Sequence, residues 1–170
     1  MKRPVAQYIR ELATDLNART PGPGVGVIGM CFTGGFALAA AVDDAVLASV
    51  LSQPAVPIGL TPAHKRHTGL PAADLNDVVG RARSGDLKAV GLRFSDDGQS
   101  PAQRMKTLQA QLGSAFEFIP LNSARGNPDE FSSSAHSVLT DEVREDPPNR
   151  AFHARERVVA FLAERLRAGA

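Results

Sequence analysis

Four short apolar runs are spaced along the chain, and a segment with a helical pattern follows each of them. The runs cover residues 25–29, 45–51, 87–94 and 115–121. The first run lacks the polar alternation of a half-exposed strand, which is typical of a strand covered on both faces. Strand–helix alternation of this kind predicts a parallel sheet with helices on both sides. We therefore expect an α/β protein, a three-layer α/β sandwich with a short parallel sheet of about four strands.

Helices are expected between and around these strands. Val5, Ile9, Leu12 and Leu16 fall at steps of four, three and four, which predicts a helix that ends near Asn17. Further helices are expected over residues 36–42, 72–82 and 150–166. Residues 52–71 contain four prolines and little periodicity, so they are expected to form an irregular segment near the site.

A fifth helix is predicted to begin near residue 100. Ser100 is expected at the N-cap, Pro101 at the first helical position, and Gln103 completes a capping box. Gly113 is placed to end this helix.

The composition excludes several classes of function. Nineteen basic and eighteen acidic residues give a net charge of +1 without a basic block, so neither nucleic acid nor an anionic membrane is an expected partner. One cysteine excludes an internal disulfide, and the longest apolar stretch is far shorter than the roughly 20 residues that span a bilayer. We expect a single domain over residues 1–170, located in the cytoplasm.

The segment Gly29-Met30-Cys31-Phe32-Thr33-Gly34-Gly35 lies between a predicted strand and an apolar helix. A nucleophile elbow requires this setting and small flanking residues, because the turn is sharp. A nucleophile at this position projects above the sheet at a helix N-terminus, where backbone N–H groups face a developing oxyanion. The competing interpretation is a buried structural cysteine that packs as a small hydrophobic residue. The flanking glycines favour the elbow.

The same region contains a glycine pattern typical of dinucleotide-binding loops, but this interpretation is excluded. Gly24, Gly26 and Gly29 spell G-x-G-x-x-G, but a dinucleotide-binding loop needs its strand before the first glycine. Here the predicted strand lies inside the pattern.

The stretch VGVIGMCFTGGFALA resembles the elbow of the dienelactone hydrolase family, in which cysteine replaces the serine of other α/β-hydrolases. The family pattern is commonly G-x-C-x-G-G, and Thr33 stands at the first of the paired glycine positions. The resemblance covers about residues 5–166 and implies a partial α/β-hydrolase fold, its C-terminal portion. It implies Cys31 as nucleophile, the backbone N–H of Phe32 as oxyanion donor, and no cofactor. A second oxyanion donor comes, in the family, from a loop that precedes the elbow.

The same resemblance implies a Cys-His-Asp triad in the order nucleophile, acid, histidine. Asp96 and Asp97 follow the third predicted strand; family spacing favours Asp97, although both could simply cap a turn. His136 precedes the last helix, in a segment AHSVLT that resembles the family's histidine loop. His64 and His67 have no further ligands nearby, so no metal is expected.

Three functions remain open at this point. The first is hydrolysis of small carboxylic esters or lactones through a thioester intermediate. The second is a catalytically impaired relative that binds a small ligand or a partner chain, and the third is a thiol protein that senses oxidants through Cys31. Because the strand at residues 25–28 would lack a neighbour on one side, we also expect self-association into a homo-oligomer.

Overall fold

The computed structural model describes residues 4–145 and 148–167. Its centre is a four-stranded sheet in which consecutive strands are neighbours and every pair is parallel, in the order β1-β2-β3-β4. The strand bounds are Val25–Met30 for β1, Val46–Ser52 for β2, Lys88–Phe94 for β3 and Phe116–Leu121 for β4. The four predicted strands are therefore confirmed, each within two residues at its ends.

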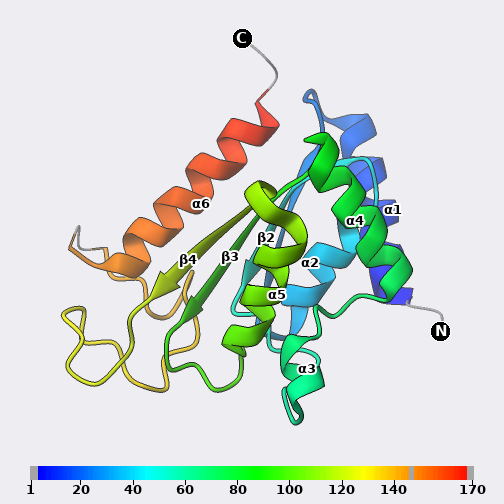
Figure 1. The fold of residues 1–170 in the computed structure, drawn as a ribbon. Helices are drawn as coiled ribbons and strands as arrows, with labels where there is room; N and C mark the ends of the chain where they lie inside the picture. Colours follow the sequence, from blue (N-terminus) through cyan, green and yellow to red (C-terminus); the bar gives the residue numbers. More distant parts are fainter. Residues whose placement is uncertain (1–3, 146–147, 168–170) are drawn as a thin grey trace.

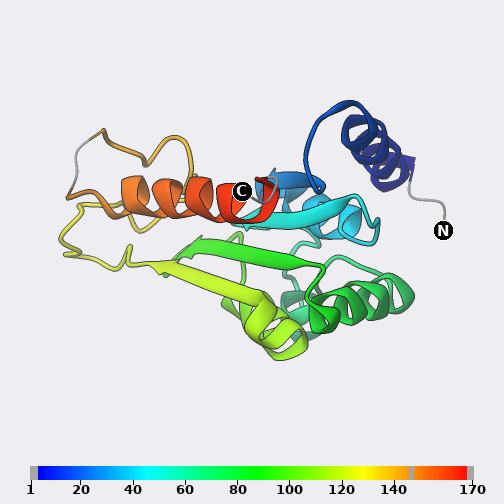
Figure 2. The same cartoon turned by 90° about the horizontal axis from the view of Figure 1, so that it is seen from above.

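Helices cover both faces of the sheet, which confirms the predicted three layers. The crossover helices α2 (Gly34–Ala40), α4 (Ala72–Ser84) and α5 (Ala102–Leu112) share one face, and α6 (Arg150–Leu166) crosses the other (Figures 1 and 2). This division follows from the strand order, because right-handed crossovers that all step in one direction place their helices on the same side.

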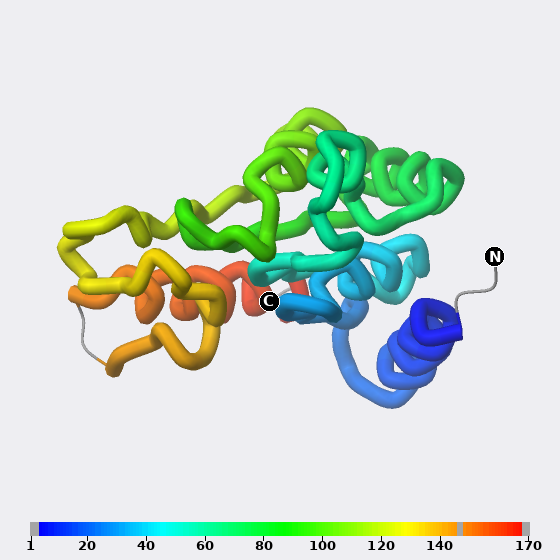
Figure 3. The backbone as a smooth tube through the Cα atoms, turned by 90° about the horizontal axis from the view of Figure 1, so that it is seen from below, coloured from blue at the N-terminus to red at the C-terminus, as the bar shows by residue number. Residues whose placement is uncertain are grey.

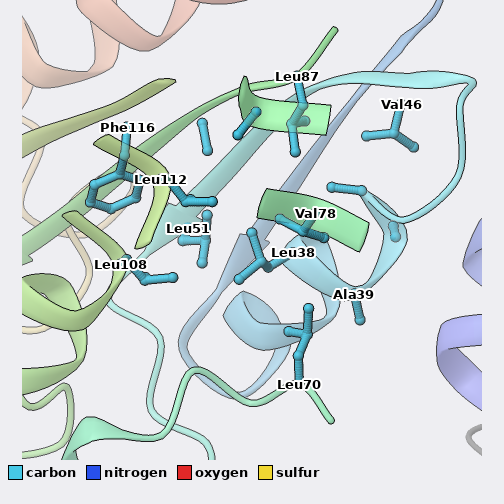
Figure 4. Close-up of a cluster of buried hydrophobic side chains, with 14 of the residues drawn as sticks. Leu38, Ala39, Val46, Leu51, Leu70, Val78, Leu87, Leu108, Leu112 and Phe116 are labelled. Atoms are coloured by element: carbon cyan, nitrogen blue, oxygen red, sulfur yellow. The ribbon is translucent and has the colours of Figure 1, made fainter. Parts of the chain in front are cut away.

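Two hydrophobic clusters join these layers. One lies between the sheet and the crossover helices, where Leu38, Leu51, Val78, Leu87 and Leu108 are fully buried and point toward a common centre (Figure 4). The other lies under α6 and contains its buried residues Ala154, Val158 and Phe161. The predicted inward residues of α6 are confirmed, with Leu162 packed at the margin of this cluster.

Helix α1 (Pro4–Arg19) forms as predicted but turns its large apolar residues outward. Ala6 and Ala13 are its buried residues, whereas Val5, Leu12 and Leu16 are 39–50% exposed. The helix packs on α2 and lies at one end of the molecule, apart from the rest of that layer (Figures 2 and 3).

The outer side of β1 is also less covered than the sequence predicts. Ile28 and Met30 are 48% and 37% exposed, so the expectation of a strand covered on both faces is wrong for this half of β1. The reason is its position: β1 is the edge of the sheet, and α6 approaches only its first part. A Cβ on Gly26 would lie 2.8 Å from Leu162 Cδ2, while Ile28 and Met30 lie beyond this contact.

Two details of the helices differ from the prediction. The irregular segment after β2 contains a short helix, α3 (Pro62–Arg66), which the side chain of Thr61 caps by accepting from the His64 N–H. Helix α5 begins one residue later than expected, with Pro101 at its N-cap. Ser100 does not cap it, because its N–H donates to the Asp97 carboxylate and draws the residue into the preceding turn. Gly113, with φ of 55°, ends α5 as predicted.

No helix within residues 4–145 and 148–167 is both long and apolar enough to cross a bilayer.

Candidate active site

Cys31 lies at a sharp junction between strand and helix. It follows the last residue of β1 directly and opens η1 (Cys31–Thr33), a short 3₁₀ turn that leads into α2. Its φ is +51°, a left-handed conformation that is uncommon for a residue with a Cβ and frequent at functional sites. The side chain is half-buried. The structure therefore gives Cys31 the backbone geometry that a nucleophile elbow requires.

The flanking glycines leave no space for a side chain. A Cβ on Gly29 would lie 2.3 Å from the carbonyl oxygen of Thr33, and a Cβ on Gly34 would lie 2.7 Å from Pro54 Cα. Both contacts are shorter than real Cβ atoms show. The sharp turn therefore explains the glycine at position 29, and the close approach of the segment after β2 explains the glycine at position 34.

Thr33 stabilises the turn at Cys31 through hydrogen bonds, a role that the sequence did not suggest. Its hydroxyl accepts from the Met30 N–H at 3.0 Å and donates to the Met30 carbonyl at 2.8 Å. These bonds join the end of β1 to the first turn of the helix. A glycine at this position would leave both backbone groups of Met30 without that partner.

Asp97 and His136 are brought together from two different loops. The Nδ1 of His136 lies 2.8 Å from Oδ2 of Asp97, and the other carboxylate oxygen accepts the backbone N–H groups of Gln99 and Ser100 at 2.9 and 3.2 Å. Asp97 is 4% exposed. A carboxylate held in this way fixes the ring so that His136 presents Nε2 as its free nitrogen.

Arg93 braces the loop that carries Asp97. Its guanidinium donates to the carbonyls of Asp97, Ser95 and Ser100 at 3.0, 3.2 and 2.8 Å. Burial lowers the pKa of Arg93, and the nearby carboxylates of Asp97 and Asp96 act in the opposite direction. Nothing in the sequence distinguishes this arginine from a surface residue, apart from its place near the end of a buried strand.

His136 and Cys31 are not joined by a hydrogen bond within the described residues. The Nε2 atom of His136 is buried and has no hydrogen-bond partner there.

Phe32 follows Cys31 in η1, and its ring is exposed. Its N–H belongs to a helix start, where N–H groups lack intrahelical partners. The structure thus pairs two of the predicted triad residues and places the third at its elbow.

An apolar cavity of about 350 Å³ opens beside Phe32. Its wall combines the start of α1 with Phe36 and with residues 56–57, 67 and 69 of the segment after β2. Cys31 itself is not among the lining residues. His67, the polar side chain in this wall, accepts the Gly69 N–H at Nδ1. Among the described residues, no group of three His, Cys, Asp or Glu side chains could hold a metal ion.

One buried arginine of α5 holds the segment after β2 in place through hydrogen bonds. Arg104 of α5 is fully buried, and its guanidinium donates to the backbone carbonyls of Pro54, Pro57, His64 and His67. Burial lowers the pKa of Arg104. One wall of the cavity is therefore held in place by a side chain of α5, which lies in the same layer as α2.

Solved structures with the same architecture set this site in context. A protein of Klebsiella pneumoniae subsp. pneumoniae assigned to the dienelactone hydrolases superposes with a TM-score of 0.59 at 18% identity, over 96% of this chain and 63% of that chain. A 2,6-dihydroxy-pseudo-oxynicotine hydrolase superposes with a TM-score of 0.57 at 11% identity, over 95% of this chain and 47% of that one. The chain has a partial α/β-hydrolase fold. It spans less than two thirds of the length of either neighbour.

The sequence itself gives no comparable match. Neither a protein-family model nor a curated protein matches it. The similarity is therefore one of fold, and it agrees with the partial α/β-hydrolase fold that the resemblance implied.

Proposed function

We propose that this chain hydrolyses small carboxylic esters or lactones, with Cys31 as nucleophile, His136 as general base and acid, and Asp97 as the residue that orients His136. The observation that carries the proposal is the 2.8 Å contact between His136 Nδ1 and Asp97 Oδ2, together with the unpaired Nε2 on the same ring. A triad needs this tautomer, with Nδ1 protonated and Nε2 ready to accept a proton.

The reaction proceeds in two halves. His136 takes the thiol proton through Nε2, and the Cys31 sulfur forms a bond to the ester carbonyl carbon. The Phe32 N–H donates to the resulting oxyanion. As the intermediate collapses, the bond from carbon to the leaving oxygen breaks and His136 returns its proton to that oxygen. The alcohol is released and a thioester remains.

Water completes the cycle. His136 removes a proton from a water molecule, whose oxygen attacks the thioester carbon. The carbon–sulfur bond then breaks, the acid product leaves and the proton returns to the Cys31 sulfur.

A non-catalytic alternative has two observations in its favour. Cys31 and His136 share no hydrogen bond in the described residues, and these residues offer one backbone oxyanion donor at Phe32 in place of two. Because the loss of one such donor typically lowers kcat on the order of a hundred- to a thousandfold, a protein of this kind could bind a small ligand or a partner without turnover.

Hydrolysis of p-nitrophenyl acetate separates the two functions. The proposal expects measurable hydrolysis by the wild-type chain, and a fall in kcat/KM on the order of a thousandfold in Cys31→Ala and in His136→Ala. His153→Ala is the matched control, because this histidine is exposed on α6. Equal activity in wild type and Cys31→Ala would contradict the proposal.

A further inference from the structure

Three of the four strands are followed by a residue with a place in the proposed mechanism. Cys31 follows β1, Asp97 lies in the turn after β3, and His136 lies in the loop after β4. The carboxyl ends of parallel strands share one edge of the sheet, where such sites form. The residue that follows β2 directly is Gln53, and the proposed mechanism does not use it.

Gln53 is the neighbour of Cys31 across the sheet. The last register pair of β1 and β2 joins Met30 to Ser52, so Cys31 and Gln53 are the residues at which these two neighbouring strands end; such strands lie about 4.8 Å apart. The chain after Gln53 stays in contact with the elbow, since the Ala55 N–H donates to the Cys31 carbonyl at 2.9 Å.

Gln53 shares the unusual conformation of Cys31. Its φ is +36°, and it is 2% exposed. A buried, non-glycine residue in the left-handed region is strained, and such residues concentrate at functional sites.

The amide of Gln53 has one end bound and one end free. The Ser52 hydroxyl donates to its Oε1, which directs the amide nitrogen away from Ser52, and the backbone N–H donates to the Leu92 carbonyl at 2.7 Å. No hydrogen bond from Nε2 reaches any of the described residues. The atom is not among the solvent-inaccessible side-chain atoms that lack a partner, so its N–H groups are free to donate to water or to an oxygen of a bound ligand.

We propose that Gln53 is a substrate-binding residue whose Nε2 donates to a second oxygen of the substrate, a few bonds from the scissile carbonyl. This inference rests on the proposed hydrolysis and narrows its substrates to esters or lactones with such an oxygen on the acyl side. The distance between neighbouring strands limits how far this second oxygen can lie from the scissile carbonyl. An oxygen bound by Gln53 at the end of β2 lies about one strand spacing from Cys31 at the end of β1.

Two probes of equal length test the proposed contact. The acyl groups of p-nitrophenyl methoxyacetate and p-nitrophenyl butyrate differ by one oxygen in place of a methylene. In Gln53→Leu, the ratio of kcat/KM for methoxyacetate over butyrate is expected to fall about tenfold relative to wild type, the effect of one lost hydrogen bond. Gln109→Leu, at an exposed position on α5, should leave the ratio unchanged. An unchanged ratio in Gln53→Leu, with the wild type active on both esters, overturns the inference and leaves the proposed function intact.

A second readout is independent of turnover. Cys31 is the one cysteine, so alkylation by iodoacetate and iodoacetamide reports on its surroundings alone. In Gln53→Glu, a carboxylate beside the thiol is expected to lower the rate ratio of iodoacetate over iodoacetamide about fivefold, whereas Gln109→Glu should not. Changes in the thiol itself affect both reagents alike and cancel. An unchanged ratio places residue 53 outside the site and overturns the inference, whether or not the chain hydrolyses esters.

Discussion

The Nδ1 of His136 contacts Oδ2 of Asp97 at 2.8 Å, whereas the carboxylate of the adjacent Asp96 accepts, from the residues that the structure describes, only the Ser95 hydroxyl. Asp97 is buried and Asp96 is exposed. One step along the backbone therefore separates a carboxylate that fixes a histidine from one that lies in solvent.

Asp97→Asn is expected to retain the fold and to lower kcat on the order of a thousand- to ten-thousandfold, because the amide would favour the wrong tautomer of His136. Asp96→Asn should change kcat by less than about threefold, since an exposed carboxylate of this kind contributes little. Steady-state hydrolysis of p-nitrophenyl acetate measures both, with circular dichroism to check folding. The reverse order of effects would assign the acid to Asp96.

Thr33→Ala should lower the free energy of unfolding by about 1–2 kcal/mol, because it removes both bonds to the Met30 backbone. Thr33→Ser keeps the hydroxyl and should stay within about 0.5 kcal/mol of wild type. Urea denaturation of the three proteins tests this prediction. If Ala and Ser behave alike, the hydroxyl does not fasten the turn.

Arg104→Met should lower the free energy of unfolding by about 3 kcal/mol or more, since four backbone carbonyls lose a charged donor. The loosened segment after β2 should also become accessible to limited proteolysis. Arg83→Met, at an exposed position on α4, is the control and should be nearly neutral. Equal stability of the two variants would show that Arg104 does not hold this segment.

We further propose that the chain self-associates through the open edge of β1, where Ile28 and Met30 are exposed. Sedimentation velocity over a concentration series should show an increasing mean mass, and Ile28→Lys should shift this increase to higher concentration. A monomer at all concentrations in the wild type would refute self-association.

The apolar runs predicted the sheet and its layers, and the glycine pattern predicted the sharp turn at Cys31, because both depend on local geometry. Asp97 and His136 were predicted from the family resemblance, and the structure brings their side chains into contact. The sequence did not predict which face of α1 is buried. Small residues, Ala6 and Ala13, allow the helix to approach α2 closely, and periodicity alone favours the larger residues Val5 and Leu12. The expectation that Ser100 caps α5 is wrong because its N–H donates to the Asp97 carboxylate, a contact that depends on the tertiary fold. The guanidinium contacts of Arg93 and Arg104 likewise reach backbone carbonyls that carry no signal in the sequence.

The most direct test of the central claim is the intact mass of the protein shortly after it is mixed with p-nitrophenyl acetate. A thioester mechanism predicts one acetyl group per chain, located on Cys31 by peptide mapping, and a burst of p-nitrophenol no larger than the protein concentration. Cys31→Ala should show neither the acetyl group nor the burst. Turnover by the wild type without acetylation of Cys31, or undiminished turnover by Cys31→Ala, would contradict the account.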